Sequence, residues 1–129
     1  MTTAQDTSFV DHLTQNVAVQ FLDRVAASAD HEAYRYPKGD DWESVTWKET
    51  GEQVKRLAAG LLSLGIEREQ RVGIASNTRY EWILADLAIM CAGAATTTVY
   101  PSTNSGDVAY ILADSDCRVV FAEDDEQVE

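Results

Sequence analysis

Short polar clusters follow three short stretches of mainly apolar or β-branched residues, and the side chains of these clusters are the best candidates for binding a ligand. The stretches cover residues 71–75, 95–99 and 118–122, and the clusters that follow them are Ser76-Asn77-Thr78, Tyr100-Pro101-Ser102-Thr103 and Glu123-Asp124. If the stretches are parallel strands, the clusters lie beyond the carboxyl ends of one sheet. Open α/β sheets bind their ligands at that edge.

The same clusters also have ordinary structural uses. Ser76 or Asn77 can cap the next helix, Pro101 favours a turn, and Asn104 or Ser105 can cap the helix after it. We therefore expect structural roles at most of these positions.

Other residues with catalytic side chains stand alone. Asp86 interrupts an apolar helical stretch, and because an unpaired buried carboxylate is costly, we expect it at a solvated edge or bonded to a neighbouring group. His12 and His31 have no acid or nucleophile nearby in sequence, so we expect both to be solvated.

The two cysteines give no sign of a metal or redox site. Cys91 and Cys117 lack CxxC spacing and clustered histidines, which is typical of buried, reduced thiols in a cytosolic protein. The sequence shows neither a secretory signal nor an apolar run long enough to cross a bilayer. We expect a cytoplasmic protein.

The lysines exclude one common kind of phosphate chemistry. Glycine-rich phosphate loops end in a lysine, but the only lysines are Lys38, Lys48 and Lys55. No such loop can therefore follow Lys55. We expect no catalytic, cofactor-binding or metal-binding residue in this chain.

Charge and composition set further limits. The formal net charge of −12 repels phosphate backbones, which argues against a nucleic-acid partner. With 45% hydrophobic and 25% charged residues over 129 positions, the chain resembles a globular protein that can bury one sizeable core.

The first third of the chain predicts a leader, a helix and a hairpin. Residues 1–13 are polar and irregular and predict a flexible leader. Val17, Phe21 and Val25, with Leu22 on the flank, predict an amphipathic helix over 16–27. Two aromatic stretches, 32–36 and 42–46, surround a turn and predict a short β-hairpin. We expect Trp42, Trp47 and Trp82 to pack in a core or an interface.

A second helix is predicted between Thr46 and Gly65. Thr46-Trp47-Lys48-Glu49 forms a capping box at its start, and Gly65 is well placed to end it. An apolar stripe then follows the helical period, made of Val54, Leu57, Ala58, Leu61 and Leu62. Gly51 and Gly60 inside this helix predict that another backbone passes close by.

The remaining residues alternate strands with helices. Strands are predicted at 71–75, 95–99 and 118–122, and helices at 79–91 and 107–113. This order predicts an α/β fold with a parallel βαβαβ unit whose strands are covered on both faces. The acidic residues 123–129 suit the first turn of a further helix.

Three pieces of sequence in a fixed order suggest a family. The first is Val45-Thr46-Trp47-Lys48-Glu49 leading into residues 56–66. The second is residues 71–82, which contain Arg79-Tyr80-Glu81-Trp82. The third consists of residues 86–94, Val99-Tyr100-Pro101, residues 108–112 and residues 119–121. Together they resemble the N-terminal subdomain of the adenylate-forming superfamily, which contains acyl-CoA ligases, luciferases and peptide-synthetase adenylation domains. The Arg-Tyr-Glu-Trp and Val-Tyr-Pro-Ser versions are most similar to bacterial long-chain fatty-acid ligases.

The resemblance implies a two-step reaction for a longer parent enzyme. A fatty-acid carboxylate would attack the α-phosphate of Mg-ATP to give an acyl-adenylate and pyrophosphate, and the thiol of CoA would then displace AMP. In the family the reacting groups are held by a Ser/Thr/Gly-rich loop ending in Lys-Gly, by later motifs and by a C-terminal lid, none of which this sequence contains. We therefore expect residues 14–129 to be a truncated AMP-binding-type subdomain, inactive by itself, with ATP, Mg and CoA bound by the parent. Its partner would be the remainder of the ligase chain or a protein covering the exposed sheet.

Two other functions remain open. A free-standing, non-catalytic α/β interaction module would use its sheet edge or a helix face to bind another chain. A small flavodoxin-type nucleotide-binding domain would be stabilised by ATP, AMP or FMN.

Overall fold

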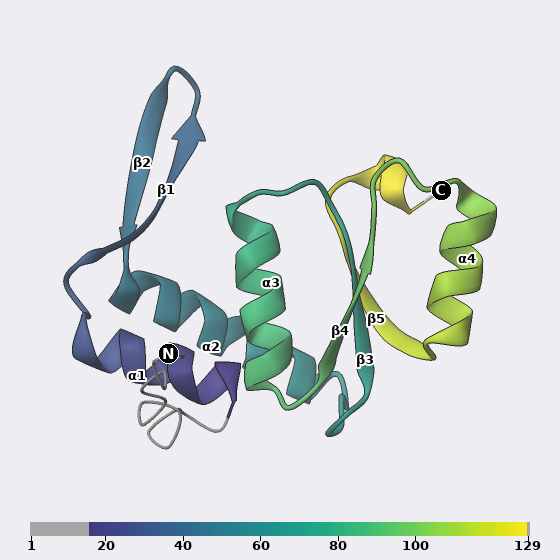
Figure 1. Ribbon diagram of the computed structural model, residues 1–129, viewed down its shortest axis with the longest axis horizontal. Helices are drawn as coiled ribbons and strands as arrows, with labels where there is room; N and C mark the ends of the chain where they lie inside the picture. Colours follow the sequence, from purple (N-terminus) through teal and green to yellow (C-terminus); the bar gives the residue numbers. More distant parts are fainter. Residues whose placement is uncertain (1–15, 129) are drawn as a thin grey trace, which may run out of the picture.

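The computed structural model describes residues 16–128 (Figure 1). The predicted leader, His12 included, lies outside the described residues. In chain order the elements are α1 (Val17–Ala27), β1 (Glu32–Lys38), β2 (Asp41–Thr46), α2 (Trp47–Ser63), β3 (Arg71–Ala75), α3 (Tyr80–Cys91), β4 (Ala95–Val99), α4 (Ser105–Asp114), β5 (Cys117–Ala122) and a 3-10 helix (Asp125–Gln127). The predicted order of helices and strands is confirmed.

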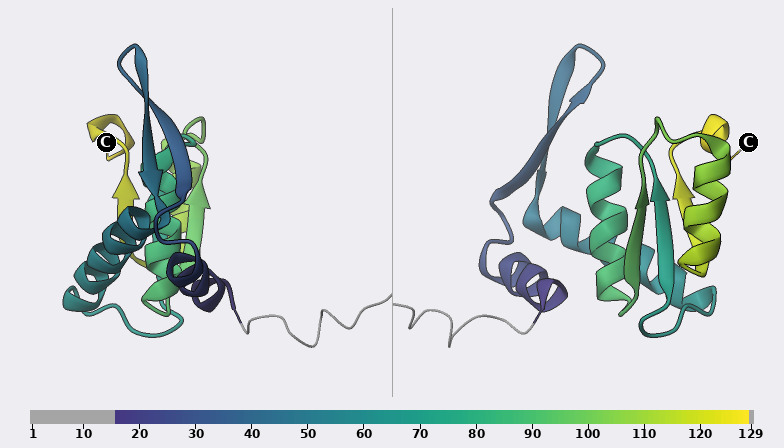
Figure 2. Two further views of the ribbon diagram at one scale, coloured as in Figure 1. Left: turned by 90° about the vertical axis from the view of Figure 1, so that its left-hand side faces the viewer. Right: turned by 45° about the vertical axis from the view of Figure 1, so that its right-hand side comes forward.

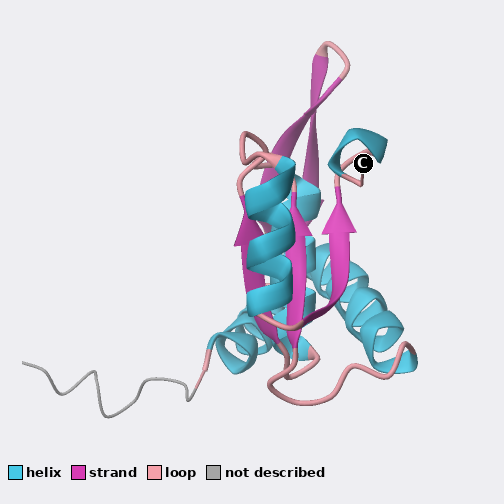
Figure 3. Cartoon of the chain, turned by 90° about the vertical axis from the view of Figure 1, so that its right-hand side faces the viewer, coloured by secondary structure: helices cyan, strands magenta, loops and turns pink. Residues whose placement is uncertain are grey.

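The second half is a three-stranded parallel sheet between helices. Its strand order is β4-β3-β5, so the chain moves from β3 to one side and then returns to the other. Helix α3 covers one face and α4 the opposite face (Figures 1 and 2). The predicted α/β fold is confirmed, and Figure 3 shows the three strands running in one direction. The reversal at β3 creates a switch point between the carboxyl ends of β3 and β5.

Only the central strand is covered on both faces. In β3 every residue after Arg71 is buried, whereas β4 and β5 keep residues that are partly or fully exposed. The prediction that all three strands are doubly covered was therefore wrong, because β4 and β5 are edge strands. Gly73 permits the tight packing at the centre, since a Cβ there would lie 3.1 Å from Val120 and 3.2 Å from Leu112.

Two apolar cores share helix α3. One lies between α1, β2, α2 and α3 and includes Phe21, Val54 and Leu87. The other lies between α2, β3 and α3 and includes Leu61 and Ile89. Because α3 contributes to both, its sequence is apolar around most of its circumference.

The ends of α1 and α2 follow the sequence signals. Asn16 accepts a hydrogen bond from the backbone N–H of Val19, and Thr46 and Glu49 form the predicted capping box. Gly65 has φ of 86° just after α2, a left-handed conformation that glycine adopts without strain.

The two glycines inside α2 differ from the prediction. At Gly51 a Cβ would lie only 2.7 Å from Cγ1 of Val25, so a side chain of α1 approaches there rather than another backbone. At Gly60 nothing lies within 4 Å. The apolar stripes are also narrower than predicted, because Leu62 of α2 is 54% exposed and Val17 of α1 is 51% exposed.

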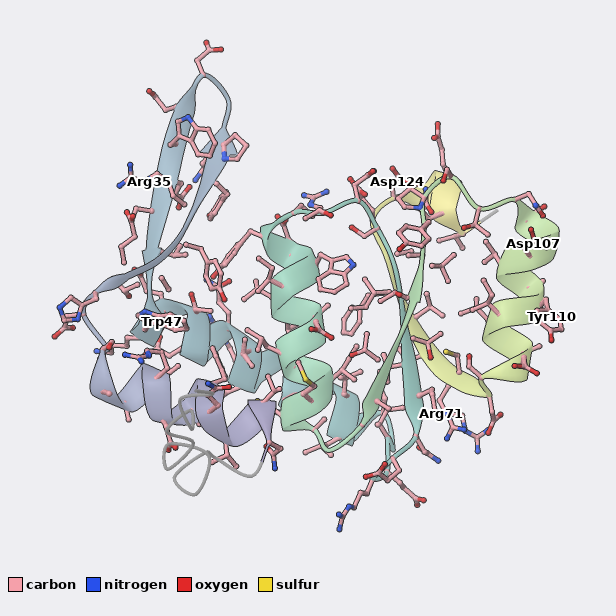
Figure 4. The ribbon with its side chains drawn as sticks, viewed as in Figure 1. Arg35, Trp47, Arg71, Asp107, Tyr110 and Asp124 are labelled. Carbon is pink, nitrogen blue, oxygen red and sulfur yellow. The ribbon has the colours of Figure 1, made fainter. Side chains whose placement is uncertain are left out.

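The β1–β2 hairpin projects from the body and is anchored at its base (Figure 1). Trp47 lies at that base in Figure 4 and packs against Phe21 and Tyr34, with ring centroids 6.3 and 5.9 Å apart. Tyr36 stacks on Tyr80 of α3 at 4.8 Å. Trp42 is 67% exposed on the distal half of the hairpin, so of the predicted packing in a core or an interface, packing in a core is wrong for this residue.

Candidate functional site

Two of the three predicted clusters meet at the switch point of the sheet. Ala75 and Ala122 are register partners, so the residues after them leave β3 and β5 side by side. The Glu123 carboxylate accepts hydrogen bonds from the backbone N–H of Asn77 at 2.7 Å, the Asn77 amide at 3.0 Å and the Ser76 hydroxyl at 3.3 Å. Arg79 adds an ion pair at 3.1 Å. We call these residues, with Glu81, the Glu123 cluster.

Hydrogen bonds, together with ion pairs to Arg79, stabilise the ionised form of the carboxylates in this cluster. The backbone and side-chain N–H groups of Asn77 lower the pKa of Glu123 below its usual range, and Arg79 and Ser76 lower it further. Arg79 also donates from Nε to Glu81 at 2.7 Å, and this bond lowers the pKa of Glu81. The Glu123 side chain is only 18% exposed, so its partners replace much of its water.

The third cluster stays separate. In the loop after β4, the backbone N–H of Thr103 bonds the carbonyl of Tyr100 at 2.9 Å, which confirms the turn expected at Pro101. Asn104 caps α4 by accepting from the backbone N–H of Asp107, also as expected. Tyr100 is 79% exposed, and within residues 16–128 no hydrogen bond joins this loop to Glu123.

The structure changes two predictions, one about the residue that caps α3 and one about the pair Glu123-Asp124. Neither Ser76 nor Asn77 caps α3, because Arg79 is the capping residue and its side chain makes no cap bond. Glu123 joins the cluster, whereas Asp124 caps the 3-10 helix by accepting from Gln127. Figure 4 shows Asp124 at the carboxyl end of the sheet and Arg71 at the opposite end.

The isolated candidates have structural partners. Asp86 accepts a hydrogen bond from the Thr96 hydroxyl at 2.6 Å, so it bonds a neighbouring group as expected. His31 is exposed, and Cys117 contacts the Ser115 hydroxyl at 3.3 Å. Burial raises the pKa of the half-buried Cys91 thiol, which disfavours the reactive thiolate. Across the described chain, no group of three His, Cys, Asp or Glu side chains could hold a metal ion.

A groove beside the Glu123 cluster exposes one face of the sheet. Its volume is about 500 Å³, and α2, α3 and the ends of β3 and β5 form its walls. The apolar walls are Leu57, Ile74, Trp82, Leu84, Ala85 and Phe121, and polar side chains at the rim include Gln53, Arg56 and Arg79. We call it the sheet-face groove. A second hollow, lined by Tyr36, Lys38 and Tyr80 among others, lies between the hairpin and the start of α3.

This arrangement acts as a structural clamp. The N–H groups of the β3–α3 loop, which could hold an anionic ligand at a switch point, are satisfied by the protein's own Glu123. The cluster's only base beside a nucleophile is the Glu123 carboxylate, 3.3 Å from the Ser76 hydroxyl, and Asn77 and Arg79 already bond that carboxylate. Its chemistry is to fasten the exit of β5 to the start of α3.

Sequence reasoning identified the position of this clamp but missed two of its members. Arg79 and Glu81 were predicted only as the start of a helix. The partner of Glu123 lies 46 residues earlier in the chain, and no local pattern indicates such a pairing. The only sequence signal for this pairing was that the loops containing Asn77 and Glu123 both follow predicted strands of the same sheet.

Comparison with known proteins identifies the family. The AMP-binding enzyme family matches residues 21–129. The long-chain-fatty-acid–CoA ligase FadD15 of Mycobacterium tuberculosis is 37% identical over 110 residues, which are 85% of this chain and 18% of FadD15. The uncharacterized protein Rv1549 of M. tuberculosis is 29% identical over 123 residues, which are 95% of this chain and 65% of that protein.

Solved structures agree in fold. The N-terminal subdomain of Klebsiella oxytoca NpsA, in complex with 3-hydroxybenzoyl-AMSN, superposes with a TM-score of 0.80 at 20% identity, over 95% of this chain and 30% of that one. The chain thus spans less than a fifth of FadD15 and under a third of the NpsA subdomain. Within residues 16–128, no helix is both long and apolar enough to traverse a bilayer. The matched region covers most of the sequence, and this chain belongs to the AMP-binding enzyme family.

Proposed function

We propose that residues 14–129 form the scaffold of the N-terminal subdomain of a long-chain fatty-acid–CoA ligase. The observation that carries this proposal is the 37% identity to FadD15 over 110 residues. The complete enzyme would join a fatty acid to CoA through an acyl-adenylate, using Mg-ATP. Residues elsewhere in the ligase would hold these substrates, because no glycine-rich loop ending in lysine follows Lys55.

The role of this chain in that reaction is mechanical. The Glu123 cluster fixes where β5 ends relative to α3, and the two cores hold the sheet against α2 and α3. Such positioning matters because a misplacement of about 1 Å can cost 100-fold in rate. Cys91 and Cys117 are free thiols, which fits a cytoplasmic location for the ligase.

A chimera tests the proposal. The 110 matched residues of FadD15 are replaced by the corresponding residues of this chain, and fatty-acid-dependent ATP–pyrophosphate exchange is measured. We expect exchange within about tenfold of FadD15, because a compatible scaffold leaves the reacting groups in place. A folded chimera without exchange would contradict the proposal.

The chain alone provides the complementary measurement. We expect no fatty-acid-dependent exchange from residues 1–129, since the reacting groups of the family lie outside it. Exchange catalysed by this chain alone would place the chemistry within these residues and overturn the scaffold role.

A second candidate function is a free-standing interaction module without catalysis. It is favoured by the match to Rv1549, of which the aligned residues make up 65%. For such a module we expect a monodisperse chain that binds one specific partner without any other part of a ligase. A chain that binds no partner by itself would favour the ligase scaffold instead.

A further inference from the structure

The Glu123 carboxylate is bound in the way that a separate ligand would be. Its Oε2 atom accepts from the backbone N–H of Asn77 at 2.7 Å and from the Asn77 amide at 3.0 Å, and it lies 3.3 Å from the Ser76 hydroxyl. Its Oε1 atom accepts from Nη1 of Arg79 at 3.1 Å. Both oxygens are therefore held by donors from one short segment, residues 76–79, which we call the carboxylate cradle.

The carboxylate cradle belongs to the loop between β3 and α3, whereas Glu123 follows β5. Asn77 offers its backbone N–H near the start of α3, where the helix dipole favours an anion, and Arg79 adds a positive charge. Arg79 holds Glu81 through Nε at 2.7 Å, so its Nη1 group stays available for a second carboxylate. These donors recognise the carboxylate group itself, and a free carboxylate in the same place would make the same bonds.

Two hollows of the surface meet at the carboxylate cradle. Arg79 and Glu123 line the sheet-face groove of about 500 Å³ and also the second hollow, between the hairpin and the start of α3, of about 760 Å³. The Glu123 side chain is only 18% exposed, although it lines both. A ligand that enters from either hollow must therefore displace Glu123 to reach the N–H groups of Asn77.

We infer that the carboxylate cradle is a binding site for a carboxylate ligand, and that Glu123 inhibits this site by occupying it. The register of β3 and β5 holds the internal carboxylate beside the loop, which gives it a high effective concentration there. A free carboxylate is excluded while Glu123 is in place and binds once that side chain is removed. The inference does not depend on the ligase assignment, because every contact that carries it lies within this chain.

Rescue of a truncated variant by acetate tests the inference. Glu123→Ala removes the Cγ methylene and the carboxylate, which together have the size of acetate. In the 129-residue chain at pH 7, we expect this change to lower the Tm and acetate to raise it again. The rise should saturate, and it should reach roughly 4–7 °C at ten times the Kd of acetate. Sodium chloride keeps the ionic strength constant, and acetamide, which has a similar shape without the charge, should have no such effect.

Matched variants separate binding at the cradle from a general effect of the salt. Glu126→Ala truncates an exposed glutamate in the same way and should gain nothing from acetate, and neither should the wild-type chain, whose cradle is filled. In the Glu123→Ala background, Arg79→Gln should weaken acetate binding roughly tenfold. Arg68→Gln, which changes a side chain that is 89% exposed, should leave the Kd of acetate unchanged.

Three results would overturn the inference. Equal Tm rises in Glu123→Ala and Glu126→Ala would mean that acetate acts through the solvent. Equal rescue by acetamide would mean that the cradle does not select a carboxylate, and a saturable Tm rise in the wild-type chain would mean that Glu123 does not exclude one. If Glu123→Ala does not fold in chloride, acetate should restore folding as measured by circular dichroism, and a chain that stays unfolded in acetate would contradict the inference.

Discussion

Single side chains connect distant parts of the sequence around the start of α3. Glu123 joins the end of β5 to the β3–α3 loop, and Thr50 joins α2 to Tyr80 of α3 through a 3.1 Å hydrogen bond. Thr50 is fully buried and Tyr80 nearly so. Because a buried polar group without a partner lowers stability, removing either partner of such a bond should also make the other partner destabilising.

The Glu123 carboxylate should make stability depend on pH. Its folded pKa is lowered, so its contribution is complete above the unfolded value of about 4.3 and is lost as the pH falls through the lower folded value. Glu123→Gln should therefore lower the Tm at neutral pH, and the two Tm curves should converge in acid. Glu126→Gln removes the same charge at an exposed position and should show no such convergence. A constant Tm difference across the whole acid range would contradict the assignment.

The Thr50–Tyr80 bond should appear as a coupling energy. Thr50→Val and Tyr80→Phe should each lower the free energy of unfolding by about 1–2 kcal/mol, because each leaves a buried hydroxyl unpaired. In the double variant, the loss in free energy of unfolding should be smaller than the sum of the losses in the two single variants, which urea unfolding can measure. Thr98→Val, at an exposed position of β4, should change stability by less than about 0.5 kcal/mol. Strict additivity of the two buried changes would argue against the bond.

At the scale of elements, helix α2 shows how neighbours decide the effect of a residue. Gly51 and Gly60 lie in the same helix and have the same intrinsic preference, yet Gly51 packs against Val25 and Gly60 faces open space. Helix propensity alone favours alanine over glycine by about 1 kcal/mol at both positions. Packing against α1 therefore determines which of the two tolerates a methyl group.

Alanine substitutions should accordingly have opposite signs. Gly60→Ala should raise the free energy of unfolding by about 0.5–1 kcal/mol. Gly51→Ala should lower it, because the added Cβ would lie 2.7 Å from Val25, and overpacking typically costs about 1–3 kcal/mol. In the Val25→Ala background, Gly51→Ala should cost less, which chemical denaturation can measure. A stabilising effect of Gly51→Ala in the wild-type background would show that α1 moves freely away from α2.

Of all features of the fold, the positions of its helices and strands were predicted best from the sequence. Residues 71–75 and 95–99 were predicted as strands with the bounds that the structure has, because short stretches of mainly apolar or β-branched residues there lie between turn residues. The strand order and the exposure of β4 and β5 were not predicted, since both depend on where the chain returns after α4. The exposure of Trp42 was missed for a similar reason: its strand has the right pattern, but the hairpin extends beyond the body. The Glu123 clamp depends on contacts 46 residues apart, which periodicity does not encode.

At the scale of the whole molecule, α3 links two cores that would otherwise be independent. Leu84 and Leu87 face the core with α1 and the hairpin base, whereas Ala85 and Ile89 face the core with β3. Unfolding of one core will unfold the other only if α3 needs its contacts with both cores to remain helical. A helix of 12 residues is too short to be stable alone in water. The described part of the chain should therefore unfold as one unit.

Hydrogen exchange can test this cooperativity directly. Val54 is fully buried in the first core, so Val54→Ala should lower stability by about 2 kcal/mol. If unfolding is global, the slowest amides of β3, in the second core, should exchange roughly 30-fold faster although Val54 lies in the other cluster. Val17→Ala, at a position 51% exposed, makes the same chemical change and should leave these amides unaffected. Unchanged protection of β3 in a destabilised Val54→Ala variant would instead mean that the two cores open separately, and that α3 survives the loss of one of them.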